Sequence, residues 1–263
     1  MEDRPRTGAE NGRLWGSRAR DWADCQEVQC RPLFEEVLTR CAVGPGTRYL
    51  DAGCGAGLAA KLAADRGARV AGFDAAEGML AVARSRVSHG DFRQAELEQP
   101  PFATGTFDVV TGFNSFQFAA DPAAALAQAK RVAKPGGTVA VAVWGTPEGM
   151  EAAAIARALR PLLPPAPNTP GPFSLSDEGE LRDFAARAGL EAIETVEVDC
   201  PWHYADLETA LRGLSSAGVS VRAAELAGAE AVDRIHRETL APFRRADGSY
   251  RVGARFRCLL TRA

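Results

Sequence analysis

The sequence predicts an α/β fold built on a doubly wound, mostly parallel sheet of seven strands. Two observations lead to this fold class. Between residues 47 and 144, short apolar runs alternate with helical patterns, which is the order expected when helices connect parallel strands. The run 139–143, Val-Ala-Val-Ala-Val, is apolar at every position, as in strands that are covered on both faces.

The elements before residue 144 follow one another regularly. We expect a flexible tail over residues 1–12 and N-terminal helices over 13–43, interrupted at Pro32. Gly44-Pro45-Gly46 ends the helical region. The strands predicted after it are 47–50, 69–73, 91–96, 107–113 and 138–144, and the helices between them are 58–65, 75–87 and 122–133.

The pattern changes beyond Trp144. A helix over 150–163 runs into a proline-rich connector at 161–167, and Ser176 is the expected cap of a helix over 177–188. Residues 191–200 and 250–260 alternate like half-buried strands, with two helical patterns between them. The sixth strand then ends at the edge of the sheet where ligands bind. We therefore expect insertions over 145–176 and 201–249 to form a lid above a substrate pocket.

Length and composition exclude several classes of protein. The 263 residues, 46% of them hydrophobic, are enough for one well-packed domain, which we place at 13–262. No run resembles a secretory leader or an apolar membrane span, so a cytoplasmic protein without a membrane partner is expected. The six cysteines form no C-x-x-C pair and the histidines do not cluster, which predicts reduced thiols and no metal site. A net charge of −3 without a basic block argues against a nucleic-acid partner.

A glycine-rich turn, Asp51-Ala52-Gly53-Cys54-Gly55-Ala56-Gly57, joins the first predicted strand to the next helix. Glycine permits φ > 0 and lets a ligand lie directly against the backbone. The free N–H groups at the start of the following helix favour a carboxylate. The spacing is G-x-G-x-G, with Leu58 where the dinucleotide fingerprint has its last glycine. This departure favours S-adenosylmethionine over NAD as the cofactor.

Four segments together resemble the class I S-adenosylmethionine-dependent methyltransferases, in particular the small-molecule branch related to quinone-biosynthesis and natural-product enzymes. They are the glycine-rich turn, Asp74 at the end of the second strand, Glu96-Leu97 before Pro100, and the segment 131–137, Arg-Val-Ala-Lys-Pro-Gly-Gly. The resemblance covers residues 47–144 with several motifs and the whole chain more loosely. It implies a Rossmann-like methyltransferase domain with a cofactor-binding core at 47–144.

The resemblance also implies roles for individual residues. Gly53, Cys54, Gly55 and Gly57 would cradle the methionine part of the cofactor, and Asp51 would face its ammonium group. Asp74 would accept both ribose hydroxyls, a bidentate task suited to a carboxylate. Glu96 would accept from the adenine amino group, and the backbone N–H of Leu97 would reach the ring. The remaining predicted cofactor contacts are Ala75, Met79, Phe113 and Trp22.

The acceptor is expected to be a small molecule, methylated at oxygen, carbon or nitrogen. Enzymes that methylate bases or glutamine typically have an Asn/Asp-Pro-Pro-aromatic motif after the fourth strand, where this chain has residues 112–117, Gly-Phe-Asn-Ser-Phe-Gln. Gln117, Trp144 and Tyr204 are candidate substrate contacts. His203, which follows the sixth strand, is the candidate general base, with lid packing as the alternative, and His236 is expected on the surface.

Two other functions stay open. The first is a fold relative that binds the cofactor without transferring its methyl group, and the second is an NAD-dependent reductase. Leu58 and the absence of a Tyr-x-x-x-Lys pair argue against the reductase. The expected oligomeric state is a monomer or a homodimer.

Overall fold

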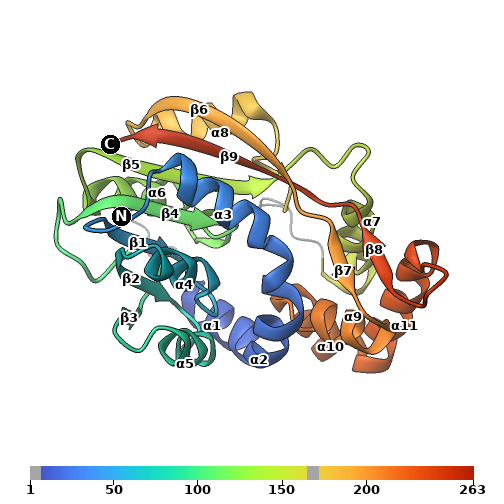
Figure 1. Ribbon diagram of the computed structural model, residues 1–263. Coiled ribbons are helices and arrows are strands. Elements are labelled where there is room, and N and C mark those ends of the chain that lie inside the picture. Colours follow the sequence, from blue (N-terminus) through green and yellow to red (C-terminus); the bar gives the residue numbers. More distant parts are fainter. Residues whose placement is uncertain (1–6, 165–171) are drawn as a thin grey trace.

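The computed structural model describes residues 7–164 and 172–263, and its centre is a seven-stranded sheet in the order β3-β2-β1-β4-β5-β9-β6 (Figure 1). All neighbouring strands pair in parallel except β9, which is antiparallel to both β5 and β6. The predicted doubly wound, mostly parallel sheet is therefore confirmed. Its strands are β1 (Arg48–Ala52), β2 (Arg69–Asp74), β3 (Asp91–Gln94), β4 (Phe107–Phe113), β5 (Ala133–Trp144), β6 (Glu191–Asp199) and β9 (Arg255–Arg262).

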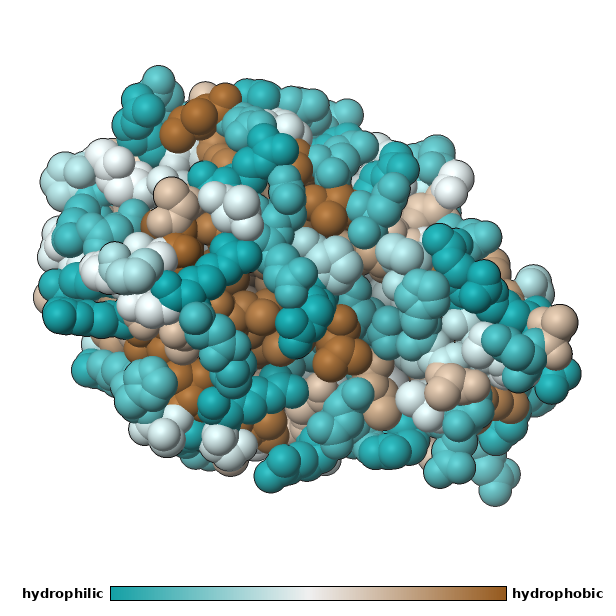
Figure 2. All heavy atoms as spheres, viewed as in Figure 1, coloured by the Kyte–Doolittle hydropathy of each residue, from teal (hydrophilic) through white to brown (hydrophobic). Residues whose placement is uncertain are grey.

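Helices cover both faces of the sheet. One layer consists of α6 (Pro122–Val132) and α8 (Glu178–Arg187), and the other of α3 (Arg31–Arg40), α4 (Leu58–Asp65) and α5 (Glu77–Arg86). Successive strand residues face opposite layers, so that Leu50 packs with α6 while Tyr49 packs with α4 and α5. Figure 2 shows polar side chains over most of one face, with apolar side chains reaching the surface chiefly around α3 and α4.

The N-terminal region is more ordered than the sequence predicted. Residues 8–12, expected to be part of a flexible tail, belong to α1 (Gly8–Gly16), and residues 1–6 lie outside the described part of the chain. After α1 come α2 (Ala19–Asp21), the π-helical turn η1 (Trp22–Gln26) and the 3-10 turn η2 (Glu27–Cys30). Pro32 stands in the first turn of α3, where a missing N–H costs nothing, so it begins a helix and does not interrupt one.

Glycines on one face of α1 let this helix pack closely against the segments that follow β2 and β3. A Cβ on Gly12 would lie 2.4 Å from the carbonyl oxygen of Ala75, and a Cβ on Gly8 would lie 2.4 Å from Cγ of Glu96. These distances are too short for any side chain, so only glycine lets α1 approach the ends of β2 and β3 this closely.

The segments predicted as insertions form a second group of packed elements beside the sheet. They are α7 (Glu151–Ala158), η4 (Arg160–Leu162), β7 (Trp202–Tyr204), α9 (Leu207–Ser215), α10 (Gly218–Ala227), α11 (Ala229–Leu240), η5 (Ala241–Phe243) and β8 (Tyr250–Val252). Their shared core includes Met150, Trp202, Leu211 and Leu240. In Figure 1 the helices α9–α11 lie at the end of the molecule where β7 and β8 project from the main sheet.

Several boundaries in this region differ from prediction. Residues 250–260 do not form one strand, because the chain leaves β8, which pairs with β7, and enters the main sheet only at Arg255. Three helices, not two, lie between β7 and β8. Asp177, not Ser176, caps α8 by accepting the N–H of Glu180 at 3.1 Å. Residues 165–167 of the predicted proline connector lie outside the described residues. No helix in the described part of the chain has the length and apolar character required to cross a bilayer.

Candidate active site

The glycine-rich turn between β1 and α4 makes two close approaches. Gly53 and Gly57 have φ of 72° and 81°, in the left-handed region that favours glycine. A Cβ on Gly53 would lie 2.5 Å from Cβ of Ser115, and a Cβ on Gly57 would lie 2.7 Å from Cβ of Ala83. The N–H groups of Gly53 and Cys54 both donate to the carbonyl of Phe73, at 2.9 and 3.0 Å. The turn is thereby tied to β2 and packed against the end of β4.

Asp51 lies at the start of this turn and is buried. Its Oδ1 accepts a hydrogen bond of 2.9 Å from the hydroxyl of Thr111 on β4. Burial raises the pKa of Asp51 to about 7, and the nearby carboxylates of Glu27 and Asp74 push the pKa in the same direction. Asp51 therefore belongs to a group of carboxylates around the turn, whose mutual repulsion a cationic ligand would relieve.

Asp74, at the end of β2, holds the turn from the other side. Its Oδ2 accepts the N–H of Gly55 at 2.9 Å, and its Oδ1 accepts the N–H of Ala76 at 2.8 Å. Loss of hydration raises the pKa of Asp74, and the backbone N–H groups oppose that shift. Each oxygen keeps a lone pair beyond these bonds, so the carboxylate has acceptor capacity left for hydroxyl groups.

Sequence reasoning missed Glu27, the first residue of η2. Its side chain is buried, and it reaches over the turn to form an ion pair with Arg86 of α5 and to accept the N–H of Leu58 at 3.3 Å. Arg86 also donates to the carbonyls of Ala56 and Ala23, at 2.9 and 3.0 Å. Nothing in the sequence around Glu27 resembles a motif, because its position depends on contacts with residues 31 and 59 positions away.

Trp22, the first residue of η1, also approaches the glycine-rich turn. A Cβ on Gly55 would lie 3.8 Å from Trp22 Nε1, which places the indole nitrogen beside this glycine. The ring of Trp22 packs edge-on against Trp15, with centroids 4.9 Å apart. Met79 is buried in the same cluster, so the structure places it behind the turn among apolar side chains.

Ala75 and the two predicted adenine contacts, Glu96 and Leu97, follow the ends of β2 and β3. Ala75 and Glu96 are both covered by α1, through the contacts with Gly12 and Gly8. Leu97 approaches the turn, with its Cδ2 3.6 Å from the position of a Cβ on Gly53. The structure thus brings the three residues to one side of the glycine-rich turn.

Residues after β4 leave buried polar atoms without partners in the described structure. These are Oγ of Ser115 and Oε1 of Gln117. The Nε2 of Gln117 donates to Oδ1 of Asn114 at 3.3 Å, and Asn114 itself has a φ of 50°. Phe113 packs edge-on against Phe34 of α3, with centroids 4.7 Å apart. Buried polar atoms without protein partners usually face a water or a ligand. With the close glycine approaches, they fit a cofactor that lies against the turn.

The candidate substrate residues differ in their surroundings. Trp144 contacts Trp202, with ring centroids 5.8 Å apart, and thus links the end of β5 to the insertions. Tyr204 is buried, and its hydroxyl donates to Oε1 of Gln26 at 2.7 Å. Trp202 Nε1 is another buried polar atom without a partner in the described residues. Trp144 and Tyr204 therefore lie where the insertions pack, whereas Gln117 contacts Asn114 after β4.

The burial of His203 and of His236 differs from expectation. The side chain of His203 is exposed, because β7 alternates and turns Trp202 and Tyr204 inward. Gln29 binds only its backbone, accepting the N–H at 2.8 Å and donating to the carbonyl at 3.0 Å. This position does not favour His203 as a base. His236, predicted on the surface, is buried with its Nδ1 3.3 Å from Oγ of Ser215, and burial lowers its pKa to about 4.

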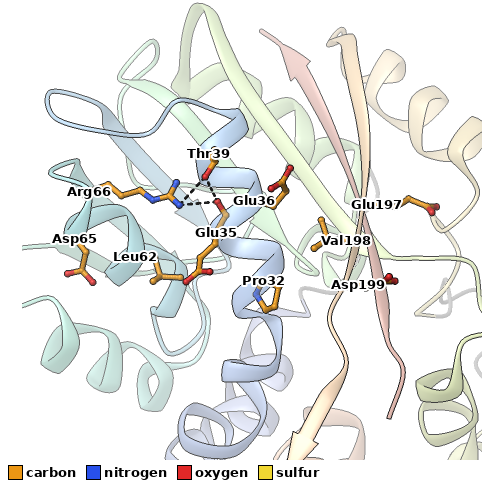
Figure 3. A pocket seen from close by; sticks show the side chains of 10 residues that line it. All are labelled: Pro32, Glu35, Glu36, Thr39, Leu62, Asp65, Arg66, Glu197, Val198 and Asp199. Carbon is orange, nitrogen blue, oxygen red and sulfur yellow. Dashed lines mark hydrogen bonds between the residues drawn. The ribbon is translucent and has the colours of Figure 1, made fainter. Parts of the chain in front are cut away.

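A hollow on the outer surface lies between α3, α4 and β6 (Figure 3). Its rim is acidic, and Arg66 bridges two positions of α3 by donating to the carbonyl of Glu35 and the hydroxyl of Thr39. The lining residues are Pro32, Glu35, Glu36, Thr39, Leu62, Asp65, Arg66, Glu197, Val198 and Asp199. None of the predicted site residues is among them, so this hollow is distinct from the glycine-rich turn.

Comparison with known proteins supports the family resemblance. Residues 50–141 match the family described as "Methyltransferase domain", a segment that begins in β1 and ends in β5. This segment is therefore similar to a methyltransferase domain, which agrees with the resemblance to the class I S-adenosylmethionine-dependent methyltransferases. The match covers the strands and the turn that carry the predicted cofactor site, and S-adenosylmethionine is the cofactor of this family.

Curated relatives match over about half of the chain. A malonyl-[acyl-carrier protein] O-methyltransferase from Serratia marcescens is 36% identical over 123 residues, covering 47% of this chain and 48% of the relative. A ubiquinone biosynthesis O-methyltransferase from Hahella chejuensis is 38% identical over 132 residues, covering 45% of this chain and 54% of the relative. The chain thus spans about half the length of the curated relatives it matches.

A solved structure extends the likeness of fold. The S-adenosylmethionine-dependent methyltransferase from Aquifex aeolicus superposes with a TM-score of 0.53 at 21% identity, covering 69% of this chain and 93% of the other. At this identity the likeness shows the methyltransferase fold alone, and the acceptor has to be argued from this chain's own residues.

Proposed function

We propose that the protein transfers a methyl group from S-adenosylmethionine to a small-molecule acceptor at oxygen, carbon or nitrogen. The observation that carries this proposal is the convergence of Asp51, Asp74 and Glu27 on a glycine turn that admits no side chain. Such a site suits a ligand that carries positive charge and lies against the backbone. Both curated relatives are named as O-methyltransferases, one of them in ubiquinone biosynthesis, which supports transfer to an acceptor of this kind.

The residues of the chain would divide the work between holding the cofactor and excluding water. The glycine-rich turn and Asp51 would hold the amino-acid end, Asp74 the ribose, and Glu96 with the Leu97 backbone the adenine. The cofactor supplies an electrophilic methyl group on a sulfonium sulfur. Transfer of that group is an in-line displacement, so orientation and an anhydrous site contribute most of the rate enhancement.

The acceptor would lie between the end of β4 and the insertions. Gln117 Oε1 and Ser115 Oγ supply polar contacts there, while Trp144 and Tyr204 supply aromatic ones. The lone pair of the acceptor forms the new bond to carbon, the carbon–sulfur bond breaks with its electrons remaining on sulfur, and any acceptor proton passes to water. A carboxylate or phenolate acceptor needs no strong base, which agrees with the exposed position of His203.

The proposal extends to the setting of the reaction. We propose a cytoplasmic enzyme, a monomer or homodimer, that acts on a metabolite and not on nucleic acid. The net charge of −3 and the absence of a basic block in the sequence support this part of the proposal.

Calorimetry and a product assay test the proposal together. The purified protein should bind S-adenosylhomocysteine and should produce it from S-adenosylmethionine when given one member of a panel of carboxylic acids, phenols and amines. Binding without production by any acceptor would support the alternative of a non-methylating relative. Failure to bind, combined with tight binding of a nicotinamide dinucleotide, would overturn the proposal.

A further inference from the structure

The carboxylate of Glu27 occupies a defined place above the glycine-rich turn. A Cβ on Gly55 would lie 3.7 Å from its Oε1, so this oxygen is in van der Waals range of anything that rests on the turn. The side chain is 5% exposed and comes from η2, outside the segment 50–141 that matches the family.

The two oxygens of Glu27 are used unequally. Oε2 pairs with Arg86, whose other bonds to the carbonyls of Ala56 and Ala23 lock the guanidinium in place. Oε1 accepts the N–H of Leu58 at the long distance of 3.3 Å, and the backbone N–H of Ala56 also interacts with the carboxylate. Arg86 thus fixes the orientation of the carboxylate, and Oε1 retains capacity to accept from a ligand.

The charges near the turn do not balance without a ligand. Glu27 and Asp74 are the carboxylates that act on Asp51, and Arg86 is the cation that pairs directly with Glu27. Burying several carboxylates with one guanidinium is costly unless they take up protons, as the raised pKa of Asp51 indicates, or another cation enters. The unpartnered Oγ of Ser115, which lies 3.3 Å from the position of a Cβ on Gly53, independently indicates that a polar ligand rests on this turn.

We propose that Glu27, held in place by Arg86, is a cofactor-binding residue whose Oε1 receives the ammonium group of S-adenosylmethionine. The inference rests on the proposed function and adds a residue from the N-terminal region to its site. Because Glu27 accepts the N–H of Leu58, this first donor of α4 is already used by the protein. The amino-acid end of the cofactor is then recognised mainly through its positive charge.

A competing role predicts the opposite result. If Glu27 instead kept the cofactor's carboxylate from binding the N–H of Leu58, removing the charge of Glu27 would free that N–H. The protein would then bind S-adenosylhomocysteine more tightly. The sign of the change in affinity therefore decides between recognition and blockage.

Calorimetry with two ligands tests the proposal. S-adenosylhomocysteine carries the ammonium group, and its analogue without the α-amino group does not. We expect Glu27→Gln to weaken binding of S-adenosylhomocysteine by about tenfold to a hundredfold, the range for a charge-assisted hydrogen bond, and to leave the deaminated analogue nearly unchanged. Unchanged or tighter binding of S-adenosylhomocysteine by the variant would overturn the inference.

Two further variants guard against trivial explanations. Glu35→Gln removes an exposed acid of α3 that pairs with Arg31, and it should leave both affinities unchanged. The double variant Glu27→Met with Arg86→Met removes the buried pair together, so no lone charge is left to unfold the region. It should unfold at a temperature close to that of the wild type and bind S-adenosylhomocysteine as weakly as Glu27→Gln does. Wild-type affinity in the double variant would contradict the inference.

The wild-type protein separates the inference from the proposed function. If it bound neither ligand, the proposed function would fall as well. If it bound S-adenosylhomocysteine and the Glu27 variants bound it equally well, only the inference would fall.

Discussion

The hydroxyl of Thr111 donates a 2.9 Å hydrogen bond to Asp51 and so joins β4 to β1 where the glycine-rich turn begins. The same hydroxyl lies 2.6 Å from that of Tyr49, which makes a buried chain of three side chains. This chain orients a carboxyl whose pKa burial raises to about 7. The stability of the protein should therefore depend on the protonation of Asp51 near neutral pH.

Asp51→Asn should flatten the pH dependence of stability. The unfolded chain releases the Asp51 proton near its ordinary pKa of 3.8, while the folded protein keeps it until about pH 7. Between these values the folded state binds more protons, so the wild-type free energy of unfolding falls as pH rises, by at most about 1.4 kcal/mol per pH unit from this group. Above pH 7 the contribution levels off.

Urea unfolding at pH 5, 6, 7 and 8 measures this difference. Because the other titrating groups are the same in both proteins, the gap between the variant and the wild type isolates Asp51. The variant should gain stability relative to the wild type as pH rises. Parallel curves for the two proteins would show that Asp51 does not titrate in this range.

Gly53→Ala should damage the site more than a comparable substitution elsewhere. Gly53 has φ of 72° and Gly136 has φ of 75°, so alanine is strained by a similar amount, about 1 kcal/mol, at both. Only at Gly53 does the new Cβ meet another atom, Cβ of Ser115 at 2.5 Å, whereas nothing lies within 4 Å of a Cβ on Gly136.

Affinity for S-adenosylhomocysteine separates the two effects. We expect Gly53→Ala to weaken binding by more than about tenfold, since misplacement of the turn disturbs positioning. Gly136→Ala should lose stability only. Equal affinities would mean that Ser115 moves aside without consequence.

Gly12→Ala should loosen α1 although alanine favours helices. An exposed helical glycine replaced by alanine gains about 1 kcal/mol of helix propensity. At Gly12 the new Cβ would lie 2.4 Å from the carbonyl of Ala75, and backbone cannot give way easily. We expect faster hydrogen exchange across α1 and weaker binding of S-adenosylhomocysteine. Gly44→Ala, in the loop after α3, is the control for a glycine with room for a side chain, because its Cβ would lie 3.9 Å from the carbonyl of Arg66, and it should change neither.

The buried hydrogen bond from Tyr204 to Gln26 should couple the insertions to the N-terminal region. Tyr204→Phe leaves the Gln26 oxygen unsatisfied and should lower the free energy of unfolding by about 1–2 kcal/mol. A double-mutant cycle with Gln26→Met isolates the pair. The two changes should cost less together than the sum of the single changes. Strict additivity would show that the contact contributes nothing.

His203→Ala should leave turnover within about twofold of wild type once an acceptor is known. Its side chain is exposed, and Gln29 contacts only its backbone. A general base contributes about a hundredfold or more. A loss of that size, with unchanged affinity for S-adenosylhomocysteine, would restore His203 as a catalytic residue.

The sequence by itself determined the alternating sheet and the glycine-rich turn. Strand 139–143 and the turn at Gly53–Gly57 are recognisable because burial on two faces and positive φ are local requirements that few residue types satisfy. Asp74 was predictable for a related reason, since the end of a parallel strand lies at the ligand edge wherever the sheet forms.

Only the tertiary structure decided which side chains reach that turn from elsewhere. Glu27 meets Arg86 across 59 positions, and Gln26 meets Tyr204 across 178. The pattern around His203 and His236 did not reveal that one is exposed and the other buried, because each depends on what packs against its element. Such contacts arise from the arrangement of several helices and strands at once, and no local spacing in the chain encodes them.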